Sequence, residues 1–265
     1  MTSQRDLVWT PFWALTFREV KRFLKVAVQT VYMPIVNSGL YLLIFGVSIG
    51  QYITLPNGLP YLAFLIPGLV MMGALNNALM NSSSSIITAK FSGELEDIRV
   101  VPLSTQNIVW AMAFGALVRG LLVGIVTFIV GAGFYWLQIG DLLSIKHPFL
   151  LLYFLCVGNL AFGKLGIAVA IWARNFDHVA TATALIITPL LYLGGVFYSL
   201  KSLSPFWQTV SHFNPLVYMI NGVRYGILGV SDVNITLCAV IVAIALIFSH
   251  VLALASLRYG SYNRW

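Results

Sequence analysis

One run of charge interrupts the long apolar stretches of this chain, at residues 93–104, which read GELEDIRVVPLS. The run holds three of the eight acidic residues. Its apolar positions fall on one side, which predicts a short amphipathic helix that Pro102 ends. Such a helix at the inner mouth of a membrane segment can offer its charged side to a soluble partner; the alternative is a solvated loop. The residues we expect at this contact are Gly93, Glu94, Leu95, Glu96, Asp97, Ile98, Arg99 and Pro102.

No group of residues predicts a catalytic centre. The four histidines are scattered, and no Ser/His/Asp set or carboxylate pair has supporting context. Residues 158–165, GNLAFGKL, imitate a phosphate-binding loop, but they lack its Ser or Thr and lie inside an apolar stretch. Cys156 and Cys238 lie in apolar segments and form no metal-binding pattern. We therefore expect a non-catalytic chain that binds no ATP, cofactor or metal itself.

The composition predicts an integral membrane protein. Hydrophobic residues make up 59% of the 265 positions and charged residues only 9%, whereas an ordinary soluble domain has about 25% charged residues. A soluble fold cannot cover that much apolar surface. The net charge of +7 comes from basic residues that flank apolar segments. It therefore indicates contact with membrane lipids and not with nucleic acid.

The apolar runs predict an all-α fold with six transmembrane helices in a single domain, 1–265. Each run has the roughly 20 residues that a membrane crossing needs. The expected spans are 27–49, 60–86, 106–136, 148–173, 179–197 and 234–257. Residues 198–233 are too apolar for a free loop, and Asn214-Pro215 breaks them. We interpret this region as two short re-entrant helices.

Residues 10–25 predict an amphipathic helix that lies in the membrane interface. Trp13, Val20, Phe23 and Leu24 are expected on one face, and Arg18, Lys21, Arg22 and Lys25 on the other. The alternative is an unusually long first span. With the N-terminus inside, ten Lys and Arg residues fall in the cytosol and three outside. The positive-inside rule then places both termini in the cytoplasm.

Polar side chains inside two spans are candidates for a substrate path. The second span carries Asn76, Asn77 and Asn81, and the fifth carries Thr188 and Tyr192. Such residues also hold helices together, so both interpretations stand. Arg119 and Lys164 are charges well inside spans, at similar expected depth. We hypothesise that together they bind a lipid phosphate or an anionic substrate head; the alternative is that both reach toward the headgroups.

Three stretches resemble the ABC-2 family of ABC-transporter permeases, particularly its YadH-like branch. They are YLAFLIPGLVMMGALNNALMNSSSSI, KFSGELEDIRVVPLS and TPLLYLGGVFYSL with FWQTVSHFNPLVYMINGVRYGILG. The resemblance covers nearly the whole chain, with the motifs in the family's order. It implies a type V exporter-like fold, a homodimer, and two copies of a separate ATP-binding subunit that holds ATP and Mg. It also implies that residues 91–104 form the coupling helix, which contacts the ATP-binding subunit.

The resemblance further implies an outer gate formed by Asn214, Pro215, Tyr218, Arg224 and Tyr225. We therefore expect the permease subunit of an ATP-driven exporter in the bacterial inner membrane. Its substrate would be amphipathic or hydrophobic: a lipid, a glycolipid or a drug. The alternatives are a passive channel or secondary transporter, and a membrane scaffold without transport. A secondary carrier usually needs an intramembrane acid, and no expected span contains one.

Overall fold

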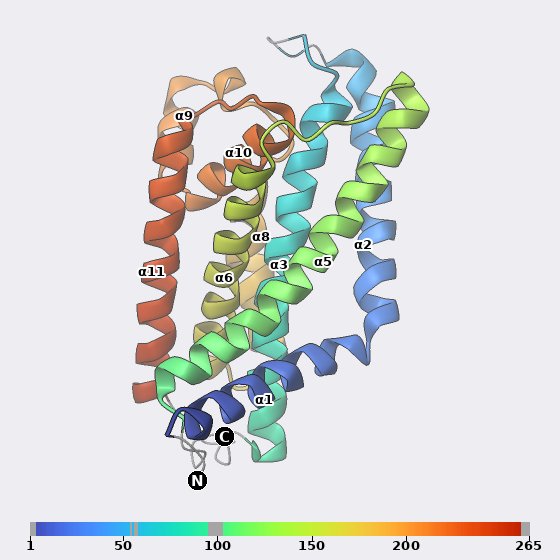
Figure 1. The fold of residues 1–265 in the computed structure, drawn as a ribbon. Helices are drawn as coiled ribbons and strands as arrows, with labels where there is room; N and C mark the ends of the chain where they lie inside the picture. The colour runs from blue at the N-terminus through green and yellow to red at the C-terminus, as the bar shows by residue number, and fades with distance from the viewer. Residues whose placement is uncertain (1–3, 54, 56–57, 95–102, 261–265) are drawn as a thin grey trace.

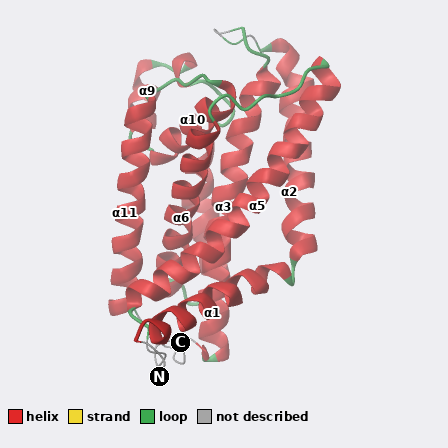
Figure 2. Ribbon diagram, in the orientation of Figure 1, coloured by secondary structure: helices red, strands yellow, loops and turns green. Residues whose placement is uncertain are grey.

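The computed structural model describes residues 4–53, 55, 58–94 and 103–260. All regular elements in these ranges are helices (Figures 1 and 2). Six of the described helical segments are long and apolar enough to cross a membrane. The prediction of an all-α, six-span membrane protein is therefore confirmed.

The spans stand side by side, with short helices at one end and α1 (Gln4–Leu24) across the other (Figure 1). The first span continues from α2 (Ala27–Tyr41) through η1 (Leu42–Ile49) and η2 (Gly50–Tyr52). The others are α3 (Tyr61–Ser92), α5 (Thr105–Ile139), α6 (Pro148–Trp172), the segment Phe176–Leu193, and α11 (Ile235–Tyr259).

Helices α3 and α6 form the centre of the bundle. In their most apolar stretches 78% and 72% of the residues are buried, against 22% in α11. Small residues let the helix backbones approach: a side chain at Gly166 of α6 would collide with the backbone of Leu79 in α3. The outer helices present apolar side chains outward, as expected of surfaces that face lipid.

The second span is longer than the sequence predicted. Helix α3 continues to Ser92 and ends at Gly93, whose φ of 83° is a left-handed conformation that favours glycine. Residues 91 and 92 therefore belong to this span and not to a separate helix at 91–104. Glu94 is described, but Leu95, Glu96, Asp97, Ile98, Arg99 and Pro102 lie outside the described residues.

The fifth span is divided into α7 (Phe176–Ala182), the wide turn η3 (Thr183–Ile187) and α8 (Thr188–Leu193). Pro189 lacks the N–H that would continue regular helical bonding, and the wide turn lies directly before it. Thr188 Oγ1 donates to the carbonyl of Thr183 at 3.0 Å, and the backbone N–H of Thr188 donates to the same carbonyl. The span ends at Leu193, before the predicted boundary at residue 197.

Between the fifth and sixth spans lie η4 (Leu200–Ser202), α9 (Pro205–His212) and α10 (Pro215–Leu228). Proline occupies the first turn of both α9 and α10, where its missing N–H costs nothing. Asn214 caps α10 by accepting from the Leu216 N–H at 3.0 Å. Both helices lie at the end of the bundle opposite α1 (Figure 1).

The arrangement gives a testable topology. Helix α1 and the end of α11 lie at the same end of the bundle, and the positive-inside rule predicts that this end is cytosolic. In a variant lacking Cys156 and Cys238, single cysteines at exposed Leu142 and Lys201 should react with an impermeant thiol reagent in intact cells. A cysteine at Arg174 should react only after permeabilisation. Labelling of Arg174→Cys from outside would show that the orientation is wrong.

Candidate functional site

A cavity of about 570 Å³ lies among α2, α3, α5 and α8. We call it the membrane cavity. Its lining combines amides, hydroxyls and one guanidinium with apolar side chains, including three methionines. Its volume falls in the range of pockets that bind small molecules, about 300–1,000 Å³. The polar side chains on its wall are Gln29, Asn37, Ser38, Tyr41, Asn76, Asn77, Arg119, Thr127, Thr188 and Tyr192.

Five of the seven residues predicted for the substrate path line this one cavity. They come from three spans, and they are Asn76, Asn77, Arg119, Thr188 and Tyr192. Asn77 donates its amide to the Gly73 carbonyl at 3.1 Å, as polar side chains in membrane helices commonly do. Asn76 is exposed on the cavity wall. These five side chains therefore share one space in the structure, and its role as a substrate path stays a prediction.

Asn81 and Lys164 lie elsewhere. Asn81 is buried, and its carbonyl and side-chain oxygens accept hydrogen bonds from Arg22 of α1. Lys164 is fully buried, with its Nζ 3.2 Å from the centroid of the Trp110 ring. This cation–π contact offsets part of the cost of burying the charge. The structure thus places Lys164 outside the cavity that Arg119 lines, and the two do not form one anion site.

An aromatic cluster adjoins the cavity wall. Tyr41 of α2 and Tyr192 of α8 both line the cavity, and their hydroxyls are 3.0 Å apart. Phe45 and Phe197 pack on them, with ring centroids 5.0 Å apart. Tyr61 fixes Phe197 by donating to its carbonyl at 2.7 Å. This cluster joins the first span to the turn after the fifth.

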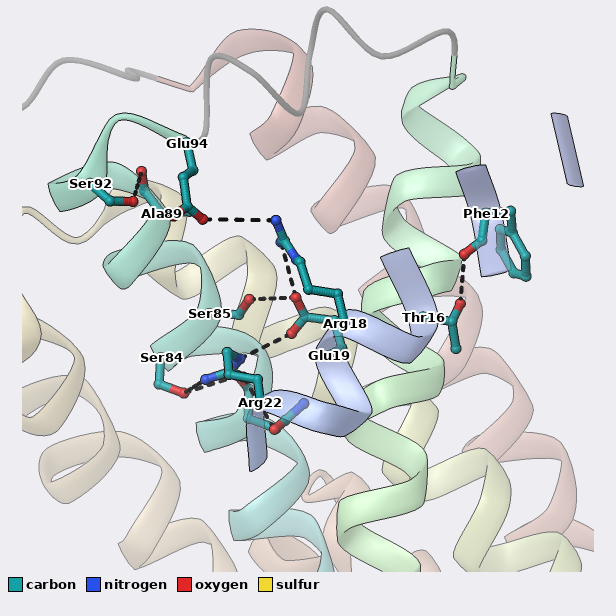
Figure 3. A network of polar contacts seen from close by, with 11 residues as sticks. Phe12, Thr16, Arg18, Glu19, Arg22, Ser84, Ser85, Ala89, Ser92 and Glu94 are labelled. Carbon is teal, nitrogen blue, oxygen red and sulfur yellow. Dashed lines mark hydrogen bonds and ion pairs between the residues drawn. The ribbon is translucent and has the colours of Figure 1, made fainter. Parts of the chain in front are cut away.

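A second polar site joins α1 to α3 at the end of the bundle that α1 crosses, the end predicted to be cytosolic (Figures 1 and 3). Glu19 is fully buried, and its carboxylate accepts from Ser85 at 2.8 Å and from Arg18 at 3.1 Å. Arg22 Nε is 3.4 Å from the same carboxylate. Arg22 also donates to Ser84 Oγ at 2.9 Å. We call Arg18, Glu19, Arg22, Asn81, Ser84 and Ser85 the inner network.

The inner network corrects the predicted faces of α1. Arg22 points to α3 and not to the headgroups, and Phe23 is buried and not on the outer face with Trp13. Close packing makes this possible, because a side chain at Gly115 of α5 would collide with Glu19. The only feature of the sequence that pointed to this network was the i,i+3 spacing of Glu19 and Arg22, which fits a local ion pair.

The network reaches the start of the predicted coupling segment. Arg18 Nη1 is 3.9 Å from a carboxylate oxygen of Glu94, the first residue after Gly93. Both side chains are largely exposed, so this contact contributes little to stability. Lys90 makes a stronger attachment nearby: its Nζ donates to the carbonyls of Ala170 at 2.9 Å and Ala173 at 3.0 Å, and to that of Ile171. A cation is favourable at this C-terminal end of α6.

The predicted outer-gate residues hold α10 in place. Arg224 is buried, lies 3.7 Å from the centroid of the Phe64 ring, and donates to the Gly195 carbonyl at 2.7 Å. Tyr218 donates to the His212 carbonyl at 2.9 Å. Asn214 donates to the Leu190 carbonyl, and the Tyr225 ring stacks on His147. Pro215 is the first residue of α10.

A bundle of six apolar helices with a partly polar cavity among them is typical of a membrane permease. Comparison with known proteins agrees. Residues 10–228 match the model of the ABC-2 type transporter family. The chain is 38% identical over 227 residues to the inner membrane transport permease YadH of Escherichia coli K12, covering 86% of each protein. It is also 31% identical to nodulation protein J of Neorhizobium galegae, covering 95% of this chain and 94% of that protein.

The chain therefore belongs to the ABC-2 type transporter family. The resemblance inferred from the three sequence stretches is confirmed. Membership assigns the chain to the transport permeases of the inner membrane, with several membrane crossings.

The inner network predicts an unequal effect of two substitutions. Glu19→Leu removes the carboxylate that pairs with Arg22, but Arg22 is 29% exposed and keeps its bond to Ser84. The cost should therefore exceed about 1 kcal/mol and stay below the about 3–5 kcal/mol of a fully buried pair. Arg18→Ala removes only an exposed partner and should cost less than about 1 kcal/mol. Thermal unfolding of the purified variants measures both. Equal stability of the two variants would show that the buried pair does not hold α1 to α3.

Proposed function

We propose that this chain is the permease subunit of an ATP-driven exporter for amphipathic or hydrophobic compounds. Two copies would form a homodimer and would associate with two copies of a separate ATP-binding subunit. The observation that carries the proposal is the attachment of the inner end of α3 on two sides. Lys90 bonds it to α6, and the inner network bonds it to α1.

This attachment suits the transmission of force. The predicted coupling segment follows Gly93 directly, so a push on that segment acts on the end of α3. Helix α3 supplies Asn76 and Asn77 to the membrane cavity on the same continuous helix. Closure of the ATP-binding subunits would thus move one wall of the cavity. The aromatic cluster at Tyr41 and Tyr192 would open in the same cycle to release the substrate.

The match to the ABC-2 type transporter family, and the similarity to an inner membrane transport permease, support transport over a scaffold role. In this proposal ATP and Mg bind in the partner subunit and not in this chain. The predicted cytoplasmic placement of both termini would put the coupling segment on the side where ATP is available.

Charge reversal in the coupling segment tests the proposal. Glu96→Lys with Asp97→Lys should leave the chain inserted and dimeric, because these residues lie between two spans. Co-purification of the ATP-binding subunit and its substrate-stimulated ATPase activity should both fall strongly. Asp141→Lys, in the exposed loop at the other end of the bundle, is the matched control and should change neither. Unchanged coupling in the double variant would refute a role for this segment.

A further inference from the structure

We propose that the membrane cavity binds an amphiphile whose head group carries an oxyanion, and that Arg119 holds the oxyanion. This inference rests on the proposed transport function and names the class of substrate that the cavity fits. The oxyanion is a phosphodiester or a carboxylate, since a guanidinium binds either with two parallel hydrogen bonds.

The cavity wall holds a positive charge that lacks a partner. Arg119 is the one charged side chain among the described residues that line it. Its Nε is buried without a hydrogen-bond partner in the described part of the chain. A charge at this depth in a membrane helix costs at least about 2.5–3.5 kcal/mol if nothing compensates it. A ligand anion supplies the compensation that the described chain does not.

The acids that the structure describes do not fill this role. None of them lines the cavity. Glu19, the buried acid of α1, already accepts hydrogen bonds from Arg18, Arg22 and Ser85. No second cation among the described lining residues assists: Lys164 lies over Trp110, and Arg22, whose charge reaches Arg119, is paired with Glu19. The site therefore offers one positive charge, which matches a head group with one negative charge.

The remaining wall defines the rest of the ligand. Asn76 and Gln29 offer amide groups to a polar head. Met33, Met72 and Met80 present flexible thioether side chains that adapt to irregular apolar shapes. A cavity of about 570 Å³ is much larger than a single phosphate or carboxylate group. It has room for a head group together with part of an apolar body, which is why we infer an amphiphile.

Lipid titration of the purified full-length chain tests the inference without nucleotide or partner subunit. Phosphatidylglycerol and phosphatidylcholine with identical acyl chains are added, and binding is followed by native mass spectrometry. The parent chain should bind phosphatidylglycerol at least about tenfold more tightly, the scale of one charge-assisted contact. Arg119→Met should lose this preference. Lys164→Met, which removes an intramembrane cation outside the cavity, should keep it.

The other outcomes are equally decisive. A full preference for phosphatidylglycerol in folded Arg119→Met would overturn the assignment, since the lipid would then bind at the basic surface of α1. Displacement of the lipid by equimolar inorganic phosphate would show a small-anion site and not an amphiphile site. If Arg119→Met does not fold, Arg119→Gln gives the same comparison. Because no partner takes part, failure here leaves the coupling experiment as a separate test of ATP-driven transport.

Discussion

Hydrocarbon offers no hydrogen bonds, so each polar group in a span must find a partner within the protein. Most polar side chains described here meet this constraint locally, by bonding a carbonyl one turn earlier. Asn77 bonds Gly73, Asn221 bonds Val217, and Thr183 bonds Val179. Side chains that reach farther connect different helices. Nine buried side-chain nitrogen and oxygen atoms of the described residues have no hydrogen-bond partner, and Arg119 Nε is one of them.

Long-range polar contacts are concentrated toward one end of α3. Ser83 donates to the Gly166 carbonyl of α6, Ser85 donates to Glu19 of α1, and Lys90 caps α6. The serine run that makes this span unusually polar therefore fastens helices together. The asparagines earlier in the same helix line the membrane cavity. The two interpretations of the polar span, helix attachment and substrate path, each apply to a different part of it.

The sequence predicted the number of spans, their approximate places and the family, because membrane crossings need long apolar runs and the motifs are specific. It could not predict which way a side chain faces around its helix axis. Arg119 and Lys164 were expected at similar depth, yet one faces the cavity and the other faces Trp110. Likewise, the burial of Glu19 depends on α3, and the local pattern of α1 showed only a basic face. Tertiary contacts decided both cases.

The bonds of α1 also imply an order of assembly during synthesis. Glu19 and Arg22 lie one turn apart, so their ion pair can form as soon as α1 leaves the ribosome. The partners in α3 are 59 to 66 residues farther along the chain. Of these contacts, only the local pair can form before the residues of α3 are synthesised. Helix α1 can therefore dock only after the second span has been synthesised, so its contacts with α3 form after that span is complete.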